Sequence, residues 1–151
     1  YENVKKSKLL LKVVVATCDS EIFKFCKKIE ADVVMTSKKH TRASDRCEEA
    51  LRKIEKKSKI NFDIVVMVQG DEPMINYKMI SQSVQPMIKN KNVNVTNLWS
   101  RIKNHKEFTD PNCIKVLCDK NNNAIYFSRL PIPGKTQMKN SKLGKQVIPL
   151  L

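Results

Sequence analysis

Arginine is scarce in this chain, which has 151 residues and a formal net charge of +14 at pH 7. Only five of its 29 basic residues are arginine, and the lysines that make up the rest are spread along the whole chain. A surface that binds a nucleic-acid backbone concentrates its cations and combines them with arginine or aromatic side chains. The even spread argues against nucleic acid as a partner and leaves a nucleic-acid-binding module only as an alternative function.

Paired cysteines and long apolar runs are also missing. The five cysteines form no C-x-x-C pair, and an odd number does not suit a framework of disulfides. They are typical of the reduced thiols of a cytosolic protein, so we expect a cytoplasmic location. No apolar run is long enough to span a membrane and no signal-peptide pattern is present, so we expect no membrane insertion.

The chain has no initiator methionine, and its two ends resemble interrupted elements. Residues 1–9 resemble the end of a helix, and residues 145–151 resemble a strand that is cut short. We therefore interpret residues 1–151 as a single, incomplete domain that forms an internal piece of a larger fold.

Strands and helices alternate in the first half of the chain. Three β-branched runs predict strands at residues 12–17, 31–36 and 63–68. A helix is predicted between the first two strands, because Ile22, Phe25, Cys26 and Ile29 form one apolar face at helical spacing. A second helix is predicted over residues 44–57, with Ser44 as its N-cap. This alternation favours parallel strands joined by helices.

The second half has a different pattern. A helix is predicted after Pro73 from the apolar side chains of Ile80, Val84, Met87 and Ile88, with Pro86 kinking it or ending it early. Three further strands are predicted at residues 93–98, 114–119 and 124–129. The short, Asn-rich turn at residues 120–123 requires the last two strands to be antiparallel, because Asn tolerates positive φ. The predicted fold class is therefore α/β, with a mixed, mostly parallel sheet and an antiparallel hairpin.

The most informative stretch is Val68-Gln69-Gly70-Asp71-Glu72-Pro73. A predicted strand stops at a glycine and is followed by a carboxylate, and ligands of open α/β sheets bind beyond the carboxyl ends of the strands. Gly70 lets a ligand approach the backbone, and Asp71 offers the hard oxygen atoms that Mg²⁺ prefers. The alternative is that the acidic residues only cap the next helix.

Several motifs follow one another in a fixed order along the chain. They are Val14-Val15-Ala16-Thr17-Cys18-Asp19, Val34-Met35-Thr36-Ser37, His40 with Ser44-Asp45-Arg46, the stretch from Gln69 to Pro73, Asp110-Pro111-Asn112 with Lys115-Val116, and Tyr126-Phe127-Ser128-Arg129 with Pro131-Ile132-Pro133. In their order and spacing these motifs resemble the 3-deoxy-manno-octulosonate cytidylyltransferases, or CMP-Kdo synthetases. That resemblance implies a Rossmann-like nucleotide-diphospho-sugar transferase fold.

The resemblance covers nearly all of this chain but only the middle of the family's domain. The family's N-terminal triphosphate loop, its second metal-binding Asp and most of its C-terminal sugar-binding part have no counterpart here. One departure is local, because Arg42 and Ala43 stand where the family usually has Ser-Gly between its His and its Asp/Glu-Arg pair. This departure leaves the exact sugar open.

The activity that the resemblance implies is transfer of CMP from CTP to a 2-keto sugar acid such as Kdo, with release of pyrophosphate, for lipopolysaccharide or surface-glycan biosynthesis. It implies Mg²⁺ as the cofactor, and CTP and the sugar acid as the partners. We also expect a homodimer when the protein is full length, and no activity from this stretch alone. A non-catalytic remnant of the fold is the alternative.

Two groups of residues are the candidates for the site. Asp71 is predicted to be catalytic and to bind the metal, while Gln69 and Gly70 are predicted to bind the nucleotide. Arg46 lies in the first turn of a predicted helix, where a cation opposes the helix dipole, so a phosphate, base or carboxylate partner is favoured over a surface ion pair. We assign Arg46 to catalysis and to nucleotide binding.

The second group lies on the predicted antiparallel pair and is assigned to substrate binding: Lys115, Ser128 and Arg129. Alternation along a strand leaves open which of these side chains face the cleft. Of the two histidines, His40 is expected in a loop near the site and His105 at the surface.

Overall fold

The structure, a computed structural model, describes residues 1–132 and the backbone of residues 145–148. The chain folds into two compact units, Tyr1–Thr96 and the described residues from Asn97 onward. The single domain expected over residues 1–151 stays a prediction. No helix in the described part is long and apolar enough to cross a membrane. All five cysteines are free in this structure.

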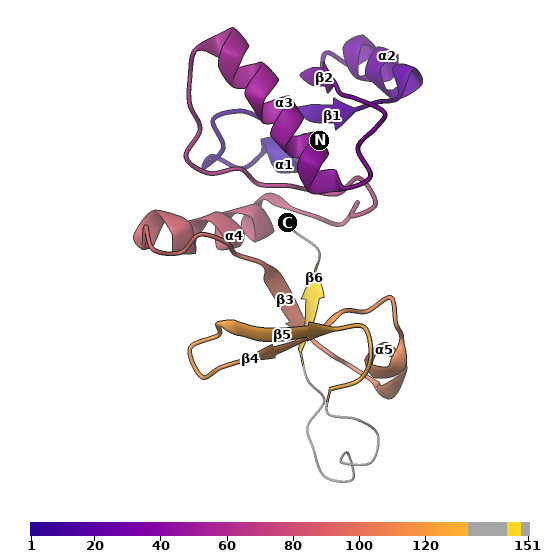
Figure 1. Cartoon of the computed structure of the whole chain (residues 1–151), viewed down its shortest axis with the longest axis vertical. Coiled ribbons are helices and arrows are strands. Elements are labelled where there is room, and N and C mark those ends of the chain that lie inside the picture. The colour runs from indigo at the N-terminus through magenta and orange to yellow at the C-terminus, as the bar shows by residue number, and fades with distance from the viewer. Residues whose placement is uncertain (133–144, 149–151) are drawn as a thin grey trace. The chain divides into compact units, whose positions relative to one another are not determined.

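The first unit is built on a parallel pair of strands joined by a helix (Figure 1). β1 (Val15–Thr17) pairs with β2 (Val33–Met35), with Val15 opposite Val33. α2 (Ser20–Lys28) connects them. The carboxylate of Asp19 caps α2 by accepting hydrogen bonds from the backbone N–H groups of Glu21 at 2.7 Å and Ile22 at 3.0 Å. The predicted strand-helix-strand unit is confirmed. Of the predicted apolar face of α2, however, only Cys26 is buried, whereas Ile22, Phe25 and Ile29 are exposed.

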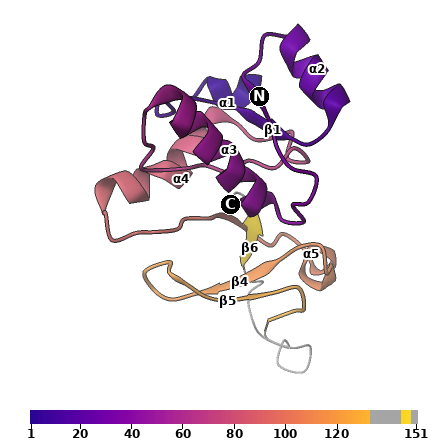
Figure 2. The ribbon, with the colours of Figure 1, turned by 45° about the horizontal axis from the view of Figure 1, so that its top comes forward.

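α3 (Ala43–Ser58) packs against β1 and β2 and buries Ala50. Figure 2 shows α3 and β1 in a second view. Its N-cap is Arg42, which makes no side-chain capping bond. The prediction that Ser44 is the cap is wrong, because the helix already begins at Ala43. The hydroxyl of Ser44 instead donates to its neighbour Asp45 at 3.4 Å.

Residues 63–68 form no strand ladder in the described structure, and only Val68 makes an isolated bridge. The prediction of a third parallel strand here is therefore wrong. A strand requires a neighbouring backbone at hydrogen-bonding distance, whereas this segment borders a cavity. The apolar pattern indicates burial, and Met67 is indeed buried. The pattern does not show whether a neighbouring strand lies close enough to pair.

α4 (Tyr77–Lys89) completes this unit together with α1 (Glu2–Lys5), which contacts it. Asn76 caps α4, because its side-chain oxygen accepts from the N–H groups of Lys78 at 3.0 Å and Met79 at 3.2 Å. The predicted apolar face is confirmed at Ile80 and Val84, which are buried, but not at Ile88, which is exposed. Pro86 lies inside the helix, which ends soon after it, at Lys89.

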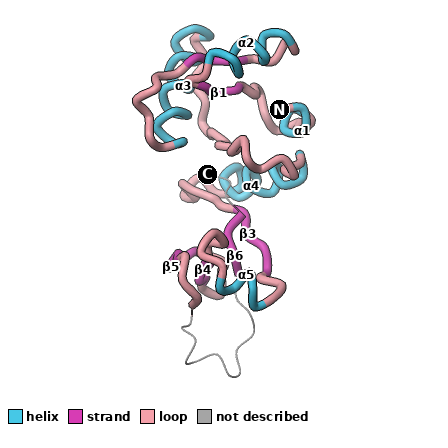
Figure 3. Tube along the Cα trace, turned by 90° about the vertical axis from the view of Figure 1, so that its right-hand side faces the viewer, coloured by secondary structure: helices cyan, strands magenta, loops and turns pink. Residues whose placement is uncertain are grey.

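The second unit is an antiparallel sheet (Figure 3). Its elements are β3 (Leu98–Arg101), α5 (His105–Thr109), β4 (Lys115–Cys118), β5 (Ala124–Ser128) and β6 (Lys145–Ile148), and its strand order is β3-β6-β4-β5. The strand predicted at residues 93–98 is displaced, since β3 begins only at Leu98. The core of the unit includes Ile102, Phe108 and Val116.

The predicted β4–β5 hairpin is confirmed. Lys115 pairs with Ser128, and Val116 pairs with Phe127. In the turn, Asn122 has a φ of 66°, which is the left-handed conformation that Asn tolerates. The α/β class with a parallel sheet and an antiparallel hairpin is therefore confirmed, with parallel and antiparallel pairs in separate sheets.

Candidate functional site

The unit Tyr1–Thr96 contains a cavity of about 780 Å³, which is within the size range of small-molecule sites. Residues 9–16 and residues 61–73 line it, together with residues of α3. Most of the lining is apolar. The polar exceptions include three predicted site residues, Arg46, Gln69 and Asp71, and Gly70 lines the cavity beside them. The structure thus brings together all four candidates of this unit.

Asp71 lies in a turn in which the N–H of Glu72 donates to the carbonyl oxygen of Gln69 at 3.2 Å. Its side chain is exposed, and its carboxylate makes no hydrogen bond or ion pair with the part of the chain that the structure describes. The next helix, α4, is capped by Asn76. The alternative that Asp71 or Glu72 caps this helix is therefore wrong, and the carboxylate of Asp71 is free to bind a ligand.

Gly70 leaves open space beside Asp71. A Cβ atom added to Gly70 would meet no atom within 4 Å, and its backbone is not in the positive-φ region. Neither packing nor backbone conformation therefore requires glycine at this position. What glycine provides is access to the backbone.

Arg46 binds the loop that follows β2. Its Nη1 donates to Thr36 Oγ1 at 2.6 Å and to the carbonyl oxygen of Ser37 at 3.3 Å, and its Nη2 donates to the carbonyl oxygen of His40 at 3.5 Å. All these acceptors are neutral, and Arg46 forms no ion pair with any described carboxylate. The alternative of a surface ion pair is therefore not realised, and no described carboxylate neutralises the positive charge of Arg46.

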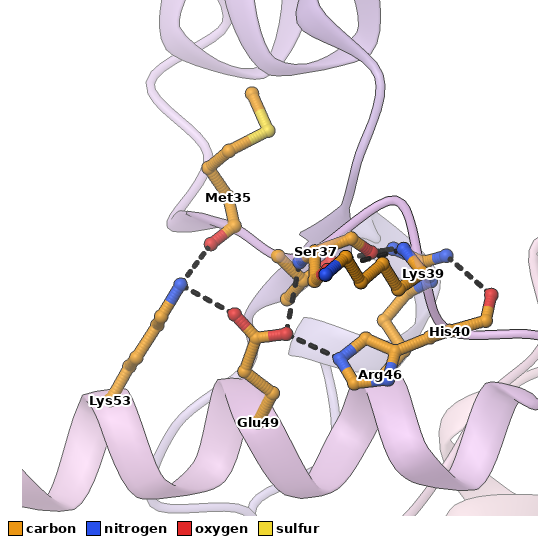
Figure 4. A network of polar contacts seen from close by, with 8 residues as sticks. Met35, Ser37, Lys39, His40, Arg46, Glu49 and Lys53 are labelled. Atoms are coloured by element: carbon orange, nitrogen blue, oxygen red, sulfur yellow. Dashed lines mark hydrogen bonds and ion pairs between the residues drawn. The ribbon is translucent and has the colours of Figure 1, made fainter.

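Glu49 is a functional candidate that we did not single out from the sequence. Its Oε1 contacts Lys53 Nζ at 2.6 Å, while its Oε2 accepts from the backbone N–H of Ser37 at 2.9 Å and contacts His40 Nε2 (Figure 4). The hydrogen bonds from Lys53, Ser37 and His40, in that order, lower the pKa of the Glu49 carboxyl from 4.5 to about 2. The side chain is only 23% exposed.

A sequence signal for this network exists in the spacing of three charged residues. Arg46, Glu49 and Lys53 recur at i, i+3 and i+7, so they lie on one face of α3. Lys53 also donates to the carbonyl oxygen of Met35, at 2.8 Å. This face of α3 therefore forms hydrogen bonds with the end of β2 and with the loop that follows it.

The second unit brings together the three predicted substrate-binding residues. Lys115 is 2% exposed, and its Nζ donates to the carbonyl oxygens of Asp110 at 2.5 Å, Cys113 at 2.7 Å and Arg129 at 2.9 Å. An ammonium group has three N–H donors, so all of them are used. In this structure Lys115 therefore shapes the surrounding loop and does not present a donor to a ligand.

The other two residues of this group differ in how many hydrogen-bond donors they leave unused. Ser128 Oγ accepts from the N–H of Leu130 at 2.9 Å, and its hydroxyl proton has no acceptor among the described residues. Arg129 is exposed and uses only Nη1 within the described chain, donating to the carbonyl oxygen of Pro111 at 3.0 Å. Of the three, Arg129 retains the most donors for an anionic ligand.

Metal-binding residues do not cluster. Among the described residues, no group of three or more His, Cys, Asp or Glu side chains is placed to hold a metal ion. A metal at Asp71 would therefore depend on this carboxylate together with water and oxygen atoms of a ligand. Mg²⁺ is commonly held in this way.

Known proteins resemble the chain closely. The 3-deoxy-manno-octulosonate cytidylyltransferase of Thermodesulfovibrio yellowstonii is 42% identical over 135 residues, which are 88% of this chain and 52% of that protein. The enzyme of the same name from Fusobacterium nucleatum is 38% identical over 147 residues, which are 97% of this chain and 58% of that protein. The chain thus spans about half the length of the curated relatives it matches.

A solved structure agrees with these relatives. The structure of CMP:2-keto-3-deoxy-manno-octonic acid synthetase complexed with CTP superimposes with a TM-score of 0.86 at 26% identity, and the match covers 99% of this chain and 59% of the other. A family model described as cytidylyltransferase matches residues 1–146. The chain therefore belongs to the cytidylyltransferase family.

Proposed function

We propose that the complete protein transfers CMP from CTP to a 2-keto sugar acid of the Kdo type and releases pyrophosphate, as a step in lipopolysaccharide or surface-glycan biosynthesis. Two relatives carry the name of this activity, and the similar solved structure is complexed with CTP. Because the chain spans about half the length of those relatives, the activity is proposed for the complete protein. A cytoplasmic location and a homodimer belong to the same proposal.

The reaction joins the anomeric hydroxyl oxygen of the sugar acid to the α-phosphorus of CTP. The bond from this phosphorus to the oxygen that bridges to the β-phosphate breaks, pyrophosphate leaves with that electron pair, and the proton of the attacking hydroxyl passes to water. Such a transfer depends mainly on positioning the reactants and neutralising phosphate charge. The protein therefore needs cations and oriented polar groups at one cavity more than it needs a nucleophile.

The observation that carries the proposal is the free carboxylate of Asp71 in the same cavity as Arg46 and Gln69. Asp71 fits Mg²⁺, which is often bound by one or two carboxylates with substrate phosphates and water. When bound, the ion supplies positive charge that stabilises the phosphate oxygens. Arg46 adds a positive charge that no described carboxylate neutralises, and the amide of Gln69 offers both a donor and an acceptor to the cytosine base.

The test is Asp71→Asn in the complete protein. This change keeps the shape of the side chain and removes its charge. We expect kcat for CTP-dependent pyrophosphate release to fall by about 100-fold or more with little change in thermal melting. Binding of Mn²⁺ in the presence of CTP, followed by electron paramagnetic resonance, should weaken in parallel.

Glu48→Gln is the control, because Glu48 is an exposed acid of the same unit that pairs with Arg52, and neither residue lines the cavity. It should leave activity within about twofold of the parent. Activity of Asp71→Asn within about threefold of the parent, or loss only through unfolding, would remove Asp71 from the site. A complete protein that releases no pyrophosphate with CTP, Mg²⁺ and Kdo would contradict the proposed function itself.

A further inference from the structure

Positively and negatively charged side chains on one face of α3 form hydrogen bonds with the loop that follows β2. Arg46 donates to the carbonyl oxygens of Ser37 and His40. Glu49 accepts from the backbone N–H of Ser37 and contacts the imidazole of His40. The same two loop residues are therefore held twice, once by each charged side chain (Figure 4).

The two oxygen atoms of Glu49 have separate tasks. Oε1 contacts the ammonium of Lys53, whereas Oε2 accepts from the backbone N–H of Ser37 and contacts the imidazole of His40. An ionised carboxylate only accepts hydrogen bonds, so the proton of the contact with His40 lies on Nε2. A glutamine has only one acceptor oxygen, because its other terminal atom is an amide nitrogen. It can therefore accept from Lys53 or from Ser37 and His40, but not from both groups.

The network also reaches the cavity. Arg46 lines the cavity, but neither Glu49 nor His40 does. Three of the oxygen atoms that orient the Arg46 guanidinium belong to Thr36, Ser37 and His40, and two of these residues are held by Glu49. The position of the guanidinium therefore depends on a carboxylate that does not itself touch the cavity.

We propose that Glu49 is a positioning residue for Arg46. It holds Ser37 and His40 against α3 and thereby orients the guanidinium of Arg46, a residue that lines the cavity, so that its charge is available to an anionic substrate. This inference rests on the proposed function, because it assigns Arg46 to the phosphates or carboxylate of the two substrates. It predicts that Glu49 acts through Arg46 and not independently of it.

The experiment is a double-mutant cycle in the complete protein, read out as kcat/KM for CTP-dependent pyrophosphate release. We expect Glu49→Gln to lower kcat/KM about tenfold or more. In an Arg46→Lys background the same change should cost less than about threefold, because the planar guanidinium that Glu49 positions is no longer present. Backbone amide exchange at Ser37 should accelerate in Glu49→Gln, because its acceptor is weakened.

Glu48→Gln is the matched control. Glu48 is the preceding residue of α3, is exposed, and pairs only with Arg52 at 2.5 Å among the described residues. It should change kcat/KM by less than about twofold and leave exchange at Ser37 as in the parent. If Glu49→Gln melts below the assay temperature, Glu49→Asp takes its place, because it keeps the charge but is one methylene too short to reach both sides.

Independent effects of Glu49 and Arg46 on kcat/KM would overturn the positioning role while leaving the proposed function intact. Faster exchange at Ser37 with unchanged kcat/KM would also overturn it, since Glu49 would then stabilise the loop without serving the reaction. An inactive parent protein would be the distinct outcome that removes the proposed function, and the positioning role would fall with it.

Discussion

Lys115 Nζ donates a hydrogen bond to the carbonyl oxygen of Arg129 at 2.9 Å, which ties β4 to the residue that follows β5. The same ammonium also donates to the carbonyl oxygens of Asp110 and Cys113. A buried cation with all its donors used by the backbone stabilises the structure around it, because the ammonium and the three part-buried carbonyls satisfy one another.

Lys115→Met tests this role, since methionine keeps most of the apolar stem and removes the ammonium. We expect the free energy of unfolding of the complete protein to fall by about 2 kcal/mol, because three part-buried carbonyls lose a charged donor. Urea-induced unfolding followed by fluorescence or circular dichroism measures the change. Lys120→Met, in the exposed turn of the same hairpin, should be nearly neutral. An equally small effect of both changes would mean that the carbonyls find other partners.

Gly70→Ala separates a ligand role from a structural one. The added methyl group meets no protein atom within 4 Å and no positive φ forbids it, so thermal melting should not change. If CTP approaches the backbone at this turn, the methyl group occupies that space, and KM for CTP should rise about tenfold. An unchanged KM, measured by pyrophosphate release across a CTP titration, would place the nucleotide elsewhere.

Acid should lower the free energy of unfolding partly through protonation of Glu49. Its carboxyl has a folded pKa of about 2 against an ordinary value of 4.5, so the folded state binds fewer protons in that interval. A carboxyl with a depressed folded pKa stabilises the protein above its unfolded value, and this contribution is lost as the pH falls from 4.5 toward 2. Glu49→Gln should therefore flatten the decline of the free energy of unfolding below pH 4.5.

The measurement for this pH dependence is urea unfolding at a series of pH values that starts at about 6 and continues down to the acid limit of folding. Glu48→Gln again serves as the comparison, because Glu48 is an exposed acid with a single partner on its own helix. Its curve should run parallel to that of the parent. Parallel curves for both variants would show that the network does not hold the Glu49 carboxylate in its ionised form.

Sequence patterns succeeded wherever their determinants were local. Asp19 predicts the start of α2 because its carboxylate needs only N–H groups two and three residues away. The Asn-rich turn predicts the β4–β5 hairpin because Asn122 adopts a positive φ of 66° and no distant residue is needed. The ordered motifs also indicated the family, because residue types and their spacing along the chain are enough to recognise a motif.

The patterns failed where a residue's role depends on a distant partner. Residues 63–68 have the composition of a strand, but their neighbours in space decide whether a ladder forms. The motif that contains Lys115 indicates substrate binding, and only folding shows its ammonium surrounded by three carbonyl oxygens. The spacing of Arg46, Glu49 and Lys53 places Glu49 on one face of α3, but only folding shows that this face binds the loop after β2.

The sequence by itself determined the family, the order of most elements and the candidates Arg46, Gln69, Gly70 and Asp71, because these depend on residue type and short spacing. Tertiary structure alone decided which candidates are free to bind a ligand. Asp71 is free because Asn76 caps the next helix, whereas Lys115 is not free because the backbone uses all its donors. A hydrogen bond joins atoms that are close in space, and closeness in space between distant residues is created only when the chain folds.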